Sequence, residues 1–128
     1  MDDVLFTVHR ILGYGLSVLV LGTAFVAFDR AKNGQEFTAG LYRAVLGLLA
    51  VHIVLGIALY TTLQAWEAEP LVAYVHPIVG VLALGVGQAM VGRARRTQMA
   101  ADAHRLAGRG LVVTLVFILV GIGVASAV

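Results

Sequence analysis

The sequence contains no cysteine, and this absence excludes several kinds of chemistry. Without thiols the chain has no disulfide, no thiolate metal site, no iron–sulfur cluster and no haem attached through a Cys-x-x-Cys-His motif. Methionine is also scarce, with three in the chain. A copper-handling protein would carry clusters of Met or Cys, so the sequence does not indicate copper transport.

Charged residues are scarce as well, at 12% of the chain, against 60% hydrophobic residues and a mean hydropathy of +0.94. A small soluble domain needs a charged surface, so this balance indicates that lipid is the solvent. Four stretches carry no charge, and each is close to the roughly 20 residues that a helix needs to cross a bilayer. They are residues 11–28, 44–66, 70–92 and 110–128.

These stretches predict an all-α integral membrane protein with four transmembrane helices in a single domain, residues 1–128. The connections between the spans are short, so consecutive helices should run antiparallel, as in an up-down-up-down bundle. The predicted spans are about 4–28, 41–63, 71–91 and 99–125.

The basic residues predict the orientation of the bundle. Every Lys and Arg except Arg10 falls on the face formed by the first and third connections, which the positive-inside rule assigns to the cytoplasm. Both termini should then lie on the outer side of a prokaryotic inner membrane. Because the basic residues flank the spans, they indicate topology and not nucleic-acid binding, despite a pI near 9.4. They are Arg30, Lys32, Arg43, Arg93, Arg95, Arg96, Arg105 and Arg109.

Each predicted span contains one histidine, and each histidine is followed four residues later by a glycine. Residues four apart share a helix face, so each imidazole stands beside a position without a side chain. An ionisable residue inside a membrane span is costly and indicates function by default. The pairs are His9 with Gly13, His52 with Gly56, His76 with Gly80, and His104 with Gly108.

This pattern predicts haem b bound inside the bundle. A bis-histidine haem needs two imidazoles from two helices at one depth, and glycine lets the helices approach the ring closely. His9 and His76 are the expected axial pair, because both should lie about 7 Å below the outer face. Arg10, beside His9, supplies a cation for the haem propionates.

A second haem, nearer the cytoplasmic face, would use His52 and His104. Their expected depths differ by about 9 Å, so the sequence leaves one or two haems open. Plainer interpretations stay open too. His9 and His76 could form interhelical hydrogen bonds alone, and His52 could be a hydrogen-bonding wall of a haem or quinone site. His104 could be a solvated interfacial residue, and the glycines could serve helix packing only.

At these motifs the sequence resembles the four-helix haem-binding half of the haem A synthase family. Val8-His9-Arg10 matches the family's His-Arg pair, Val75-His76-Pro77 matches the second histidine two helices later, and residues 51–56 resemble the intervening helix. The resemblance implies His9 and His76 as axial ligands. Phe6 stands where the family has a glutamate, and the family's cysteine pair is absent, so oxidation of the haem is not implied. Two diagonal histidine pairs also resemble transmembrane b-type cytochromes that pass electrons from ascorbate or quinol.

The sequence therefore favours a membrane b-type cytochrome, an electron-transfer haem protein more than a complete enzyme. The alternatives are a haem-modifying enzyme related to haem A synthase and a non-catalytic membrane assembly subunit. A proton-coupled exporter is disfavoured, since no acidic residue lies in the interior of a predicted span; Asp102 lies near the start of the fourth. The electron donor and acceptor stay open, with quinone as one candidate, and so does the oligomeric state, with a homo-oligomer as one option.

Overall fold

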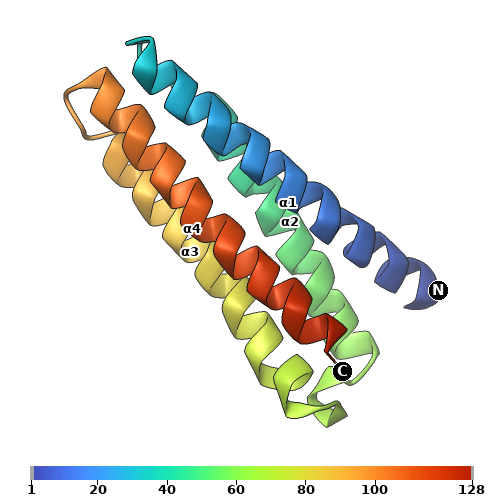
Figure 1. The fold of residues 1–128 in the computed structure, drawn as a ribbon. Helices are drawn as coiled ribbons and strands as arrows, with labels where there is room; N and C mark the ends of the chain where they lie inside the picture. The colour runs from blue at the N-terminus through green and yellow to red at the C-terminus, as the bar shows by residue number, and fades with distance from the viewer. Residues whose placement is uncertain (1, 128) are drawn as a thin grey trace.

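The computed structural model describes residues 2–127 and consists of four long helices joined by short connections (Figure 1). All four are long and apolar enough to cross a membrane, which confirms the predicted number of spans. The helices are α1 (Asp2–Lys32), α2 (Gly40–Thr62), α3 (His76–Ala94), which continues a π-helical turn, η2 (Leu71–Val75), and α4 (Ala100–Ser126); a 3₁₀ turn, η1 (Ala65–Glu67), lies between α2 and η2.

Helix α1 continues about one turn beyond the C-terminal end of the predicted span, through residues 29–32, which include charged residues. Arg30 and Lys32 lie in its last turn, where the partial negative charge of the helix end favours cations. Gly34, at a φ of +63°, then reverses the chain. The Gly34 N–H donates to the Ala31 carbonyl and the Gln35 N–H donates to the Arg30 carbonyl, the pair of bonds that defines a Schellman cap.

The start of the third span is irregular for a reason written in the sequence. Pro77 has no N–H, and its ring would collide with the carbonyl four residues earlier in a regular α-helix. The chain adopts the wider π-helical turn η2 over Leu71–Val75, directly before His76. Such turns re-aim side chains and often lie at functional sites. Here the turn ends directly before His76, the first residue of α3.

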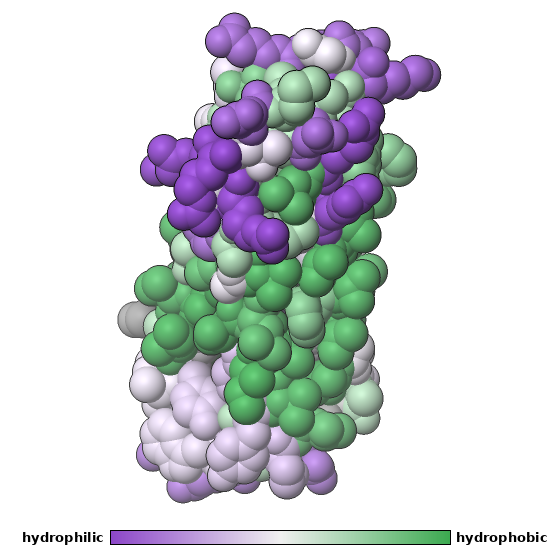
Figure 2. Space-filling model, turned by 90° about the vertical axis from the view of Figure 1, so that its left-hand side faces the viewer, coloured by the Kyte–Doolittle hydropathy of each residue, from purple (hydrophilic) through white to green (hydrophobic). Residues whose placement is uncertain are grey.

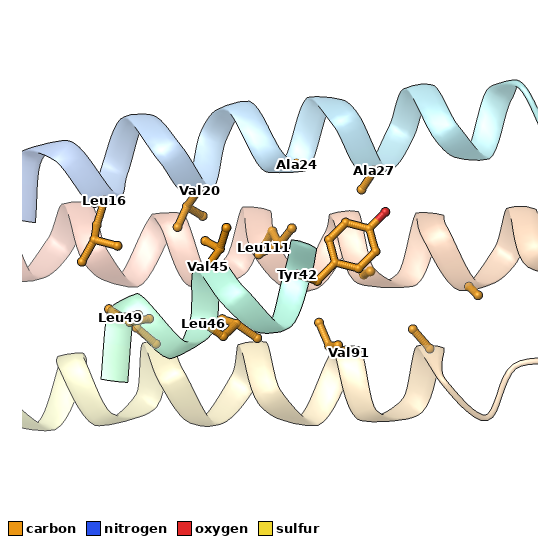
Figure 3. Close-up of a cluster of buried hydrophobic side chains, with 14 residues drawn as sticks. Leu16, Val20, Ala24, Ala27, Tyr42, Val45, Leu46, Leu49, Val91 and Leu111 are labelled. Carbon is orange, nitrogen blue, oxygen red and sulfur yellow. The ribbon is translucent and has the colours of Figure 1, made fainter. Parts of the chain in front are cut away.

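The packing of the four helices is uneven. Helix α4 packs extensively against α3 and α1, whereas α2 packs more loosely against both of its neighbours, α1 and α3. The two diagonal pairs, α1 with α3 and α2 with α4, make little contact. Figure 3 shows the apolar core between the helices, to which all four contribute. Its larger members are Leu16, Val20, Tyr42, Val45, Leu46, Leu49, Val91 and Leu111.

The outer surface of the bundle has the distribution of polarity expected of a membrane protein. Large apolar side chains are exposed along every helix, for example Phe25, Val54, Val81 and Val116. Figure 2 shows this apolar belt between two more polar ends, with strongly hydrophilic residues gathered at one of them. Both chain ends lie at one end of the bundle in Figure 1, and the first and third connections lie at the other.

Candidate functional site

Three of the four histidines meet inside the bundle, each from a different helix. The rings of His9 (α1) and His52 (α2) lie face to face, with 4.0 Å between centroids and 7° between planes. The ring of His76 (α3) meets His9 edge-on, with a centroid separation of 6.2 Å and an interplanar angle of 72°. His9 and His76 therefore lie at one level, although α1 and α3 are diagonal in the bundle.

Glycines make the contact between His9 and His52 reciprocal. Gly13 follows His9 by one helical turn, and a Cβ added there would lie 3.5 Å from Cε1 of His52. Gly56 follows His52 by one turn, and a Cβ there would lie 3.0 Å from Cε1 of His9. Each imidazole thus lies over the glycine of the other helix. The His-x-x-x-Gly spacing has a clear structural role in α1 and α2, because it leaves room for two stacked rings.

His76 is held by α4. Its Nδ1 lies 3.0 Å from the carbonyl oxygen of Gly121, and since a carbonyl only accepts, Nδ1 carries the proton and donates. Nε2 is then the unprotonated nitrogen. A backbone acceptor on one ring nitrogen is the usual way in which a protein orients a metal-ligating histidine and fixes its tautomer. Gly121, whose Cβ would lie 3.7 Å from Nδ1, is the glycine that packs against His76.

The other two rings have unpartnered nitrogen atoms. Nδ1 of His9 and Nδ1 of His52 are buried and have no hydrogen-bond partner in the described part of the chain. A buried polar atom without a partner costs free energy, about 1–3 kcal/mol. Two such atoms at one site, inside an apolar bundle, leave hydrogen-bonding capacity that no described residue uses.

One glycine predicted for this site, Gly80, makes no contact with the His76 ring. A Cβ at Gly80, the glycine that follows His76 by one turn, would meet nothing within 4 Å. Gly80 was expected to make room for the ring, but Gly121 packs there instead because the ring of His76 turns toward α4. Arg10 adjoins His9 in sequence and is exposed, so the structure leaves its expected role as a cation for a propionate untested.

His104 belongs to a different place in the fold. It is fully buried near the first connection, where its Nε2–H donates to the Glu36 carbonyl at 3.2 Å. The Tyr42 hydroxyl donates to its Nδ1 at 2.6 Å. Both nitrogens are therefore occupied by protein partners, and His52 lies against His9 instead. The structure thus places His52 and His104 in separate environments, which gives no support to the second haem that the sequence left open between them.

Aromatic side chains lie around His104, and Gly108, which follows it by one turn, packs against a further aromatic ring. The ring of Phe37 lies 5.0 Å from that of His104, and the guanidinium carbon of Arg30 lies 5.9 Å from the centroid of the Tyr42 ring. A Cβ at Gly108 would lie 2.9 Å from Cζ of Phe28, so this glycine serves contact between α4 and α1. Tyr42 was missed by the sequence analysis, although a tyrosine near the end of an apolar span could have suggested a buried hydrogen bond.

The directions of the three imidazole rings limit the kinds of ligand that the site can bind. Among residues 2–127, no group of three or more His, Cys, Asp or Glu side chains is arranged to hold a metal ion. The stacked rings of His9 and His52 cannot both direct a nitrogen at one ion, because their planes are parallel. Two imidazoles that held a haem iron would direct their nitrogens at it from opposite sides, and the rings of His9 and His76, 6.2 Å apart and not stacked, do not exclude this. The residues of the site are therefore compatible with haem and unsuited to an ion held by protein ligands alone.

The comparisons with known proteins add no assignment. A scan against models of protein families finds no match, a search of curated proteins finds none, and a search of solved structures finds none. The resemblance to haem A synthases and to transmembrane b-type cytochromes stays a prediction from short motifs.

Proposed function

We propose that this chain is an integral membrane b-type cytochrome that binds one haem b through His9 and His76 and transfers electrons. The observation that carries the proposal is the meeting of three imidazoles from three helices inside an apolar bundle, two of them with unpartnered nitrogens. Ionisable side chains in a membrane interior are costly, and their gathering at one level favours a shared ligand over accidental placement.

The separation of the rings supports the choice of ligands. Metal–imidazole bonds are about 2 Å long, so two axial nitrogens lie about 4 Å apart and the ring centroids about 6 Å apart. The centroids of His9 and His76 are 6.2 Å apart. The bond from His76 to Gly121 leaves Nε2 of that ring as its ligating atom. His9 and His52, at 4.0 Å and nearly parallel, do not satisfy the same requirement.

Each remaining residue of the site has a part in the proposal. His52 covers one face of His9 and restricts rotation of that ring. Gly13 and Gly56 keep the space beside the two rings free of side chains. Arg10, exposed and next to His9, offers a cation for a propionate. Haem iron, when bound, supplies a one-electron redox centre whose potential depends on the axial ligands and the apolar surroundings.

The proposed topology places the site near the outer face of a prokaryotic inner membrane. In an up-down-up-down bundle oriented by the positive-inside rule, both termini lie outside and the basic connections lie in the cytoplasm. One haem at the level of His9 would then exchange electrons with a donor or acceptor at the outer face, with quinone as the membrane-soluble candidate. Phe6 stands at the position where the haem A synthase family, which this sequence resembles, has a glutamate. Haem oxidation is not proposed, because Phe6 is apolar and 51% exposed.

The test is a spectrum of the purified protein in mild detergent. We expect reduced-minus-oxidised bands of a b-type haem and one haem per chain. His9→Ala and His76→Ala should each lose the haem, while His104→Ala is the matched control and should keep it, because His104 lies in another environment. A colourless protein that takes up no added haem would end the proposal and favour a non-catalytic assembly subunit.

A further inference from the structure

A second polar feature lies at the end of the bundle opposite the three histidines. An open cavity of about 340 Å³ lies between the first connection, the start of α2 and the end of α3. Arg43 enters it from the first turn of α2, and Arg95 enters it from the end of α3. Phe37, Ala39 and Gly40 form the rest of its lining, so the cavity combines two cations with one aromatic side chain, and Phe37 is the apolar wall of the cavity.

The two arginines have no protein counter-ion. Both are exposed, and within residues 2–127 the one salt bridge joins Arg105 to Asp102. No carboxylate lines the cavity. Two like charges held at one cavity repel each other unless an anion lies between them. The cavity is therefore suited to a negatively charged group that accepts hydrogen bonds from both guanidinium groups.

The apolar wall is held in place by the buried network around His104. The Phe37 ring lies 5.0 Å from the His104 ring and 6.0 Å from the Tyr42 ring. Tyr42 and His104 are both completely buried and are hydrogen-bonded to each other. Phe37 thus presents a fixed apolar surface beside the two arginines.

We propose that this cavity binds the phosphate of an anionic phospholipid headgroup, with Arg43 and Arg95 holding the phosphate and Phe37 contacting the start of the acyl region. A free phosphate would use the arginines but gain nothing from the aromatic wall, whereas a phospholipid presents charge and hydrocarbon together. Basic cavities between membrane helices at the cytoplasmic face are suited to anionic headgroups. The proposal does not depend on haem.

The location gives the lipid a structural role. Arg43 belongs to α2 and Arg95 to the end of α3, and α2 is the helix that packs most loosely in the bundle. A phosphate that bridges these arginines would tie α2 to α3 at the end where the connections are polar. Bound lipid should therefore raise the thermal stability of the protein, since a ligand that binds only the folded state stabilises it.

The experiment compares phosphatidylglycerol, phosphatidylcholine and inorganic phosphate as ligands of the full chain in detergent, by native mass spectrometry and thermal unfolding. We expect phosphatidylglycerol to bind and to raise the unfolding temperature, and phosphatidylcholine to do neither. The Arg43→Gln, Arg95→Gln double variant should bind phosphatidylglycerol about 10- to 30-fold more weakly. The matched control is the Arg93→Gln, Arg96→Gln double variant, which removes the same charge outside the cavity.

Three results would overturn the proposal. Equal loss of binding in both double variants would show that diffuse charge, and not the cavity, attracts the lipid. Equal binding of phosphatidylcholine would show that the cavity does not select an anion. Inorganic phosphate at millimolar concentration that binds as well as phosphatidylglycerol would show that the apolar wall contributes nothing and that the ligand is a free anion.

Discussion

The imidazole ring of His9 lies flat against that of His52, with centroids 4.0 Å apart and planes 7° from parallel. The ring of His9 lies over Gly56, and the ring of His52 lies over Gly13. This reciprocal contact is the one expected where two helical segments run antiparallel. His52 therefore covers His9 and does not direct a nitrogen toward the same point. If the proposed haem is bound, this geometry makes His52 a positioning residue and His9 an axial ligand, a distinction that four equivalent His-x-x-x-Gly segments do not reveal.

The first prediction concerns that distinction. His52→Asn should keep one haem per chain but shift its midpoint potential and its reduced-minus-oxidised spectrum, because His9 would lose the ring that fixes its rotation. His76→Ala, measured in parallel by haem content and redox titration, should lose the haem. If His52→Asn lost haem as completely as His76→Ala, His52 would be a ligand and the assignment of the pair would be wrong.

The second prediction concerns the space beside His9. In Gly56→Ala the new Cβ would lie 3.0 Å from Cε1 of His9, so the ring must move. We expect lower haem content and a lower unfolding temperature. Gly80→Ala is the matched control, since a Cβ there meets nothing within 4 Å and alanine favours the helix. Equal behaviour of the two variants in both assays would contradict a role for Gly56 in the site.

The sequence predicted the number of helices correctly because charge-free stretches of membrane length are a strong signal that does not depend on packing. It also predicted that His9 and His76 would lie at one depth, since depth follows from helix rise. Rotation about the helix axis was not predictable in the same way. The direction in which the His52 and His104 rings turn depends on tertiary contacts. Examples are the hydrogen bond between Tyr42 and His104 and the packing of Gly56 against the ring of His9.

Local backbone irregularity also affected the prediction of the site. A π-helical turn ends directly before His76, and Gly121 of α4 packs against the His76 ring whereas Gly80 does not. Pro77 was the available signal, because a proline inside a helix forces a local rearrangement. The form of that rearrangement, a wider turn in this chain and a kink in others, depends on neighbouring helices and cannot be deduced from the proline alone.

The third prediction concerns the buried pair of Tyr42 and His104. Tyr42→Phe removes the hydroxyl that donates to His104 Nδ1 and leaves a fully buried nitrogen without a partner, at a cost of about 1–3 kcal/mol. The variant should unfold at a lower temperature and keep its haem. Tyr74→Phe, at a 57% exposed tyrosine, is the control and should leave stability unchanged. Loss of haem in Tyr42→Phe alone would contradict the separation of the two sites.

The fourth prediction concerns orientation in the membrane, and the absence of cysteine makes it directly measurable, because the unmodified chain gives no background with thiol reagents. Thr38→Cys and Ala68→Cys place single exposed thiols in the first and second connections. The basic residues near the first connection should keep it in the cytoplasm. In intact cells a membrane-impermeant maleimide should then label Ala68→Cys, and Thr38→Cys should react only after the membrane is permeabilised. The reverse pattern would invert the bundle and place the three histidines near the cytoplasmic face, whereas labelling of both positions from outside would contradict the single crossing by α2 between the first and second connections.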